Sequence, residues 1–445
     1  MAITWRAVAL TALGAVPVLL LPVPGTVLVW VLLVALLCGV DVALAARPRR
    51  LAVSRSVPAS VRRAEATASS VTLTNLDRRR LRGVVRDAWP PSALPSPSAG
   101  RPGSPAALAR RSLRHRVDVA IGEAVRVVTP LVPTRRGDVP AGAVTVRTVG
   151  PLGLAGRQAS LPVGGRLRVL PEFASRRHLP SRLARLRELD GRAAVQVRGA
   201  GTEFDSLREY VVGDDVRSID WRATARRADV VVRTWRPERD RRVLVVVDTS
   251  RTSAVRVLDA PRLEASIEAA LLLTALAGRA GDRVELLAWD RRVRASAAGR
   301  TGSRVLPAVA DALAGVEPAL VEADWPGLVA QVRNRLSRRS LVVLLTTVDP
   351  AAAERGVLAV AAGLSERHVV VVASVADPEV EELRRGRGSP AAVFDAAAAE
   401  RTQLERQAVA QRLRRVGVEV VDALPDDLAP RLADTYLALK AAGRL

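Results

Sequence analysis

The sequence predicts a multi-domain protein with a two-helix membrane hairpin at its N-terminus, a β-rich, sandwich-like domain in its middle and an α/β domain at its C-terminus. Three patterns support this prediction. An uncharged apolar stretch comes first, short β-branched runs separated by turn residues follow, and strands alternate with helices in the second half. We expect the hairpin over residues 1–46, the β-rich domain over 51–175, a linker over 176–240 and the α/β domain over 241–445.

The membrane hairpin is predicted from the stretch between Ala7 and Val40, which contains no charged residue. A single straight helix of that length would be about 50 Å long, which exceeds a hydrocarbon core of roughly 30 Å. The sequence Pro-Val-Pro-Gly at 22–25 divides the stretch, so we expect one span near residues 3–21 and another near 26–45. A signal peptide is the alternative interpretation, but its apolar region would be too long.

Arginines on both sides of the hairpin predict its orientation. Arg6 precedes the first span, Arg47, Arg49 and Arg50 follow the second, and the connecting loop carries no charge. The positive-inside rule then places both ends of the hairpin, and the soluble domains, in the cytoplasm. Cys38 is the only cysteine, so no intramolecular disulfide can form, which is consistent with that location.

The β-rich domain is predicted from apolar and β-branched runs at 68–76, 117–128, 143–149 and 167–170. Residues 92–105 are rich in Ser, Pro, Gly and Ala, and we expect them to form a flexible insertion.

The α/β domain is predicted from alternating strands and helices, which favour a mostly parallel sheet wrapped by helices. The expected strands are 243–247, 284–288, 341–345, 368–375 and 418–421. The expected helices are 262–278, 305–315, 328–336, 351–364, 390–416 and 428–442.

The composition excludes several enzyme classes. The formal net charge is +23 and comes almost entirely from arginine, because Lys440 is the only lysine. A P-loop lysine is therefore absent, and the chain cannot be a Walker-type ATPase. The three histidines are far apart and not in metal-ligand spacing, so a zinc site built from Cys and His is excluded. We expect a protein without enzymatic activity.

Residues 199–250 combine acids, arginines and tryptophans and then enter an apolar strand that ends in Asp-Thr-Ser. The first part of this segment resembles the family catalogued as domain of unknown function 58 (DUF58). The matching residues are Gly199, Gly201, Glu203, Phe204, Leu207, Arg208, Tyr210, Gly213, Asp214, Asp215, Arg217, Ile219 and Trp221. These charged residues, with Asp220, either hold a linker in place through ion pairs and turn caps or bind a protein partner.

The resemblance implies an immunoglobulin-like sandwich in the β-rich domain, with Gly150 in place of the acid of a recurrent D-x-x-G-L turn. It also implies a von Willebrand factor A-like α/β domain, in which a D-x-S-x-S motif after the first strand binds a divalent metal. The matching residues here are Asp248, Ser250 and Thr252, with Thr301 and Asp349 as candidates from later loops. Such oxygen ligands suit Mg²⁺. Alternatively, Asp248 and Ser250 cap the following loop through hydrogen bonds.

The leading hypothesis is a membrane-anchored adaptor whose α/β domain binds another protein, and the resemblance implies a partner of the MoxR-type AAA+ ATPase class. The alternative is a protein that binds nucleic acid or anionic membranes through arginines. Its best patch is Arg222, Arg226, Arg227, Arg233, Arg236, Arg239, Arg241 and Arg242, with Trp221 and Trp235. The scattered arginines also fit a codon bias without any function. A third hypothesis is a metal-dependent hydrolase that uses Asp248, Asp214, Asp215 and Asp220.

Overall fold

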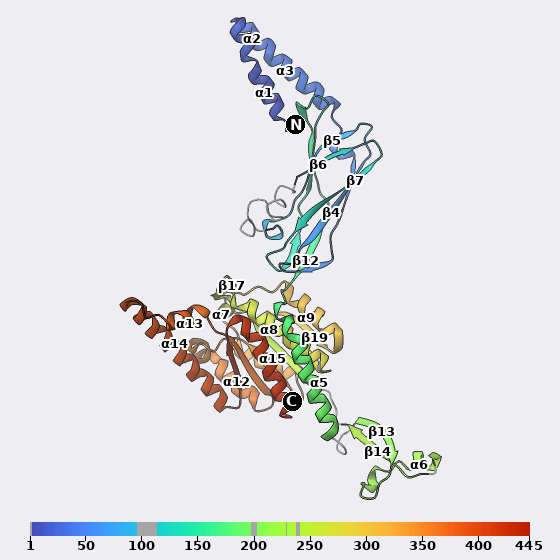
Figure 1. Ribbon diagram of the computed structural model, residues 1–445, viewed down its shortest axis with the longest axis vertical. Coiled ribbons are helices and arrows are strands. Elements are labelled where there is room, and N and C mark those ends of the chain that lie inside the picture. Colours follow the sequence, from blue (N-terminus) through green and yellow to red (C-terminus); the bar gives the residue numbers. More distant parts are fainter. Residues whose placement is uncertain (1, 96–113, 197–202, 228, 237–240) are drawn as a thin grey trace. The chain divides into compact units, whose positions relative to one another are not determined.

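The computed structural model describes residues 2–95, 114–196, 203–227, 229–236 and 241–445. They form two compact units, residues 1–172 and 173–445 (Figure 1). The first unit contains N-terminal helices and a β-rich region, and the second contains an α/β region and a two-stranded arm. The chain is multi-domain, as predicted, and each unit is described by itself.

The apolar N-terminal stretch is helical. Two short helices, α1 (Trp5–Leu13) and α2 (Ala15–Leu20), precede the longer α3 (Pro24–Leu44). In the described part of the chain, α3 is the one helix that is long and apolar enough to cross a membrane. Pro24 lies in the first turn of α3, where its missing backbone N–H breaks no helical hydrogen bond.

The C-terminal end of α3 is attached to the β-rich region by the fully buried side chain of Asp41. The carboxylate accepts hydrogen bonds from the backbone N–H groups of Leu152, Leu154 and Ala155, each at 2.8 Å. Gly150 begins this turn, and a Cβ atom there would overlap the side chain and carbonyl of Asp41. The absence of a side chain at Gly150 therefore leaves room for the carboxylate of Asp41 against this turn.

The β-rich region consists of small sheets whose short strands bury one face in an aliphatic core. One sheet has the order β11-β9-β5-β6, formed by Gln158–Leu161, Val144–Thr148, Leu81–Asp87 and Arg114–Val119. A second has the order β2-β4-β7, formed by Leu51–Ser56, Thr67–Asn75 and Ala124–Leu131. A third has the order β3-β12-β8, formed by Ser60–Arg62, Arg166–Leu170 and Gly137–Pro140, and the short strands β1 (Ala2–Ile3) and β10 (Ala155–Gly156) pair separately. Of the expected insertion at 92–105, Ala93 is buried in a short turn, and the part from residue 96 onward lies outside the described residues.

A six-stranded sheet forms the centre of the second unit (Figure 1). Its order is β19-β18-β15-β20-β21-β22, formed by Val293–Arg300, Arg283–Trp289, Arg242–Asp248, Leu341–Leu345, Val369–Val375 and Glu419–Ala423. Neighbouring strands are parallel except for the pair of β18 with the edge strand β19. The strands follow the doubly wound order 3-2-1-4-5-6.

Helices cover both faces of this sheet because side chains alternate along each strand. Val243, Val245 and Val247 share a core with α8 (Arg262–Arg279), α9 (Val305–Ala314) and α15 (Pro425–Ala441). Leu244 and Val246 face the opposite side, toward α10 (Trp325–Arg335), α12 (Leu358–Ser365) and α14 (Pro390–Arg415).

Four features of the second unit differ from the sequence-based expectation. The edge strand β19 and helix α13 (Pro378–Arg384) were not predicted. The helix expected over 351–364 is interrupted at Gly356, which has a φ of +130° and lies against Trp325. The expected linker contains a helix, α5 (Leu179–Gln196), that buries Leu186 in the same core as α15.

Candidate functional site

Asp248 and Thr346 lie where the order of the central sheet reverses. Asp248 is the last residue of β15, Thr346 directly follows β20, and these two strands are neighbours. In doubly wound sheets, ligands bind outside the carboxyl ends of the strands at this position. This edge of the sheet is therefore the first candidate site.

Asp248 is the centre of a hydrogen-bonded group that we call the rim cluster: Asp248, Ser250, Thr252 and Thr346. The Oδ1 atom of Asp248 accepts the backbone N–H of Ser250 at 2.8 Å. Its Oδ2 atom accepts the hydroxyls of Thr252 and Thr346 at 2.9 and 2.7 Å. The hydroxyls of Ser250 and Thr252 are 3.0 Å apart. The predicted motif residues are thus brought together, and the fold adds Thr346.

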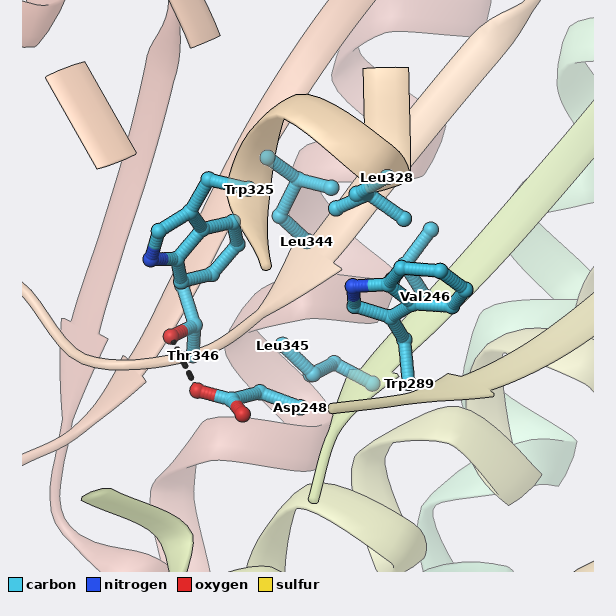
Figure 2. A pocket seen from close by; sticks show the side chains of 8 residues that line it. All are labelled: Val246, Asp248, Trp289, Trp325, Leu328, Leu344, Leu345 and Thr346. Atoms are coloured by element: carbon cyan, nitrogen blue, oxygen red, sulfur yellow. Dashed lines mark hydrogen bonds between the residues drawn. The ribbon is translucent and has the colours of Figure 1, made fainter. Parts of the chain in front are cut away.

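The rim cluster is largely covered by the chain's own residues. Asp248 is only 4% exposed. Two backbone hydrogen bonds, Ala319 N–H to Thr249 O and Arg251 N–H to Val321 O, hold the loop after α9 against this edge. Figure 2 shows the apolar cleft beside Asp248, with the indoles of Trp289 and Trp325 on its walls. The cleft leaves essentially no space for a water-sized molecule.

Asp349, a predicted metal ligand, forms ion pairs with two buried arginines instead. Arg262 Nη1 lies 2.9 Å from Asp349 Oδ2, and Arg406 Nη1 contacts Asp349 Oδ1. Arg406 also reaches Asp422 Oδ1 at 2.6 Å. Burial favours the neutral form of Asp349, but the charges of Arg406 and Arg262 outweigh it and lower the pKa of this carboxyl. Its carboxylate is therefore committed to ion pairs with two buried arginines.

Thr301, another predicted ligand, lies at the opposite end of the sheet from Asp248. It follows β19, whose last residue, Arg300, pairs with Val284 at the beginning of β18. Asp248 pairs with Trp289 at the end of β18. The antiparallel direction of β19 thus separates Thr301 from the rim cluster by the length of a strand.

These positions decide how well the site fits a metal ion. Among the described residues, no group of three His, Cys, Asp or Glu side chains could hold a metal. The rim cluster contributes one carboxylate, which already accepts three hydrogen bonds. Mg²⁺ usually keeps several of its waters in a near-octahedral shell, and the adjacent cleft has no room for them. In this arrangement the residues do not fit Mg²⁺.

The DUF58-like segment forms an antiparallel arm. Its strands are β13 (Glu203–Glu209) and β14 (Val231–Arg236), and α6 (Trp221–Arg227) lies between them. The side chains of Glu203 and Phe204 lie outside the described part of the chain.

The acids of the arm accept hydrogen bonds from other groups of the arm. Asp214 accepts the guanidinium of Arg208 and the backbone N–H of Val211, and the bond from Arg208 lowers its pKa most. Asp215 caps the turn before Ser218 through the backbone N–H of Arg217. These contacts match the structural alternative for the signature acids.

Asp220 performs a similar role at the start of α6. Its Oδ1 atom accepts the backbone N–H groups of Arg222 and Ala223, and its Oδ2 atom accepts Nε of Arg233 at 2.8 Å. The hydrogen bond from Arg233 is the main reason that the pKa of Asp220 is lowered. Tyr210 contributes its backbone N–H to Val230, and Gly213 supplies a turn with a φ of +111°.

The tip of the arm, defined by Val211, Val212, Val216 and Trp221, is apolar and exposed. Val212 is 95% exposed and Trp221 is 66% exposed. Four large apolar side chains exposed within residues 211–221 make this segment a candidate interaction surface. Trp221, a residue of the predicted signature, therefore lies on the surface.

The predicted arginine patch is divided by the structure. Arg222 and Arg226 are exposed, Arg233 is paired with Asp220, and Arg241 and Arg242 are half-buried at the start of the central sheet. The side chains of Arg227 and Arg236, and all of Arg239, lie outside the described residues.

Sequence reasoning did not identify Thr346, Arg262 or Arg406. Thr346 directly follows an expected strand, so its position at the sheet edge could have been inferred. The two arginines lie in helices far from Asp349 in the sequence, and nothing in their local pattern distinguishes them from the many other arginines.

Comparison with known proteins supports the DUF58 resemblance. A model of the family described as protein of unknown function DUF58 matches residues 206–419. Uncharacterized proteins of Mycobacterium tuberculosis and Mycobacterium bovis are 28% identical over 190 residues, or 42% of this chain. The chain covers 59% of the length of these relatives.

Two solved structures show partial similarity to this chain. A conserved hypothetical protein, BatB from Bacteroides thetaiotaomicron, is 13% identical with a TM-score of 0.30, covering 44% of this chain and 98% of that one. The CARDB domain of the PF1109 protein from Pyrococcus furiosus is 13% identical with a TM-score of 0.17, covering 27% of this chain and 87% of that domain.

Proposed function

We propose that this protein is a membrane-anchored, non-enzymatic adaptor that binds a protein partner through the tip of its arm. The observation that carries the proposal is the exposure of Val212 and Trp221 on a segment whose acids are occupied by its own hydrogen bonds. Tryptophan is enriched among the residues that dominate protein interfaces. An exposed tryptophan in the same segment as exposed valines therefore favours a docking role.

The charge of the arm favours a protein over nucleic acid or an anionic membrane. Between residues 203 and 236 the sequence has as many acidic residues as arginines, although the whole chain carries a net charge of +23. Binding to phosphate backbones depends on excess positive charge. The neutral arm lacks that excess, and its apolar tip suits an apolar cleft on another protein.

The DUF58 resemblance adds finer elements to the proposal. We propose a von Willebrand factor A-like α/β domain, two membrane passes with both units in the cytoplasm, and a partner of the MoxR-type AAA+ ATPase class. The chain has no P-loop lysine, so the partner would supply ATP hydrolysis. The covered rim cluster would serve to hold the end of β15 and the following turn in place through the hydrogen bonds of Asp248. Thr252, which is half-exposed, is the residue of the cluster closest to the solvent.

Crosslinking and affinity capture of the full chain from membranes would test the arm. Val212→Asp and Trp221→Ala should each reduce recovery of the captured partner by about tenfold or more, since hot-spot truncations cost roughly 2 kcal/mol. Val393→Asp, at an exposed valine of α14, is the matched control and should change nothing.

Two further measurements distinguish a contact made by the arm from a contact made by the rim cluster. Asp248→Ala and treatment with EDTA should leave recovery unchanged if the arm, and not a metal at the rim cluster, makes the contact. Equal recovery with wild type and both arm variants would refute the proposal. Retention of DNA or anionic liposomes at moderate salt would favour the arginine-driven alternative.

A further inference from the structure

One end of the first unit is a junction where both ends of the helical N-terminal stretch meet a single turn, residues 150–155. At the start of α1, the hydroxyl of Thr4 donates to the carbonyl of Gly153 at 2.6 Å. A Cβ atom at Gly153 would lie 2.8 Å from Nη1 of Arg6. At the end of α3, Asp41 accepts three backbone N–H groups of the same turn. The fold thus brings the beginning and the end of the apolar stretch to one place.

Arginines from separate segments of the chain surround this junction, and we call them the collar. Arg157 and Arg79 donate to backbone carbonyls in the last turn of α3, the first of them at 3.0 Å. Arg147 donates to the backbone carbonyl of Ile3. The collar consists of Arg6, Arg47, Arg49, Arg50, Arg78, Arg79, Arg147 and Arg157.

The buried carboxylate of Asp77 joins the segment after α3 to the segment after β4. Its Oδ2 atom accepts the backbone N–H of Arg47 at 2.6 Å, and its Oδ1 atom accepts the backbone N–H of Arg78 at 2.8 Å. The Oδ1 atom also lies 3.8 Å from Nη1 of Arg50. The arginines of the two segments are therefore held beside each other.

The collar carries an excess of positive charge. Among the described residues, Arg50 is its one member that forms an ion pair with a carboxylate. The other hydrogen bonds of its guanidinium groups go to backbone carbonyls, which are neutral. Asp41 and Asp77 are the acids at the junction, and both spend their oxygens largely on backbone N–H groups. Most of the arginine charge is therefore left without a counter-charge.

The remaining acids of residues 1–172 do not change this balance. They interact with groups outside the collar: Glu65 with the backbone of Arg62, Asp87 with Arg55, Asp118 with Arg80 and Arg82, Glu123 with Arg80, Asp138 with Arg168, and Glu172 with Arg63. Positions 1 and 96–113, which the structure does not describe, contain no Asp or Glu in the sequence. Within this unit the positive charge at the junction is therefore uncompensated.

The length of α3 and the apolar side chains next to the collar fit a position at a membrane surface. The helix has 21 residues, which gives a length of about 30 Å and matches the hydrocarbon core of a bilayer. Trp5, Leu76 and Leu152 are exposed apolar side chains at the junction. Trp5 directly precedes Arg6, and the backbone N–H of Leu76 donates to the carbonyl of Arg50 at 3.2 Å. Tryptophan is enriched where a membrane meets water.

We infer that the collar binds the phosphates of anionic phospholipid headgroups, an inference that rests on the membrane anchoring proposed above. Planar guanidinium groups form paired hydrogen bonds to phosphate oxygens, and arginines next to a membrane helix are attracted to anionic lipids. When α3 spans a bilayer, its C-terminal end and the collar lie at the level of the headgroups. The β-rich region then rests against the bilayer through arginines that the fold gathers from segments far apart in the sequence.

Native mass spectrometry of the full chain in neutral detergent micelles tests this inference by counting bound lipids as phosphatidylglycerol or phosphatidylcholine is added. We expect phosphatidylglycerol to bind saturably and about tenfold or more tighter than phosphatidylcholine. Arg49→Gln combined with Arg78→Gln should weaken phosphatidylglycerol binding by roughly thirtyfold, which corresponds to about 2 kcal/mol, and leave phosphatidylcholine binding unchanged. Both side chains are exposed, and neither guanidinium group has a hydrogen bond or ion pair among the described residues, so the change should spare the fold.

Arg86→Gln combined with Arg116→Gln is the matched control, because it removes the same charge from exposed positions of β5 and β6, away from the junction. It should change phosphatidylglycerol binding by less than about twofold. Equal binding of the two lipids, or an equal loss in the two double variants, overturns the inference. Inorganic phosphate should not displace the lipid, and displacement would overturn the assignment to a headgroup.

Alkaline carbonate extraction of membranes separates this inference from the proposed function. A chain that stays in the membrane but shows no lipid preference refutes only the collar, whereas a chain that carbonate releases refutes the anchoring as well. Arg222→Gln combined with Arg226→Gln, in the arm, should keep wild-type lipid binding, and a loss there would overturn the assignment to the collar. Because the collar binds anionic lipid by itself, retention of liposomes supports the arginine-driven alternative only where this arm variant loses it.

Discussion

The attachment of α3 to the β-rich region can be tested at Asp41. Its buried carboxylate is the acceptor for three backbone N–H groups, those of Leu152, Leu154 and Ala155. Asp41→Ala would leave these donors without that acceptor inside the protein. A buried donor that loses its partner costs about 1–3 kcal/mol, so the lower bound for all three is about 3 kcal/mol.

Hydrogen exchange of the full chain in micelles measures this cost locally. A loss of about 3 kcal/mol corresponds to an increase of roughly a hundredfold in the exchange rate of the three amides, since each factor of ten is about 1.4 kcal/mol. Asp41→Asn keeps one carbonyl oxygen and should give a smaller increase. Gly150→Ala should also increase exchange, because its Cβ atom would overlap Asp41.

Asp118→Ala is the control for this experiment. Asp118 is in the same region, is half-exposed and forms ion pairs with Arg80 and Arg82. Exposed ion pairs contribute little to stability, so this variant should leave the turn protected. If Asp41→Ala exchanges like wild type at all three amides, the assignment of Asp41 as the anchor of this turn is wrong.

Two other predictions concern the α/β unit. Asp248→Ala removes the shared acceptor of the rim cluster and should lower the free energy of unfolding by about 2–4 kcal/mol; denaturant titration checks this, and an unchanged midpoint would contradict a structural role for the cluster. The pKa of Asp349 is lowered below its ordinary value of 3.8, so its ionisation stabilises the fold above that pH, and this stability is lost as the pH falls through the lower, folded-state pKa. In Asp349→Asn, the free energy of unfolding should therefore fall less steeply at acid pH than it does in wild type. In Asp395→Asn, at an exposed position of α14, it should fall as in wild type.

The alternation of strands and helices was enough to predict the α/β layers, because strands such as 341–345 are continuous apolar runs bounded by polar residues. The edge strand β19 was not predictable in the same way, because its Ala- and Gly-containing sequence lacks β-branched residues, apart from Val293. Its antiparallel direction also decides where Thr301 lies, and no local pattern encodes that direction.

The candidate site was predictable only where its residues are close in sequence. The spacing of Asp248, Ser250 and Thr252 places them in one turn. The pairing of Asp349 with Arg262 and Arg406 depends on the packing of helices from distant segments, which the sequence does not display. Signature acids such as Asp214 could be identified, but the hydrogen bonds that they form with their own chain could not be inferred from the sequence.

The packing of α5 against α15 has a consequence for the order of folding. Arg182 of α5 donates to Asp434 of α15 at 2.8 Å, across 252 positions of the chain. Closing so long a loop carries a large entropic cost before any contact compensates it, and proteins dominated by distant contacts fold slowly. During synthesis α5 leaves the ribosome long before α15 does. The apolar face of α5 would therefore stay exposed to solvent until α15 is made, and chaperones would bind it in that interval.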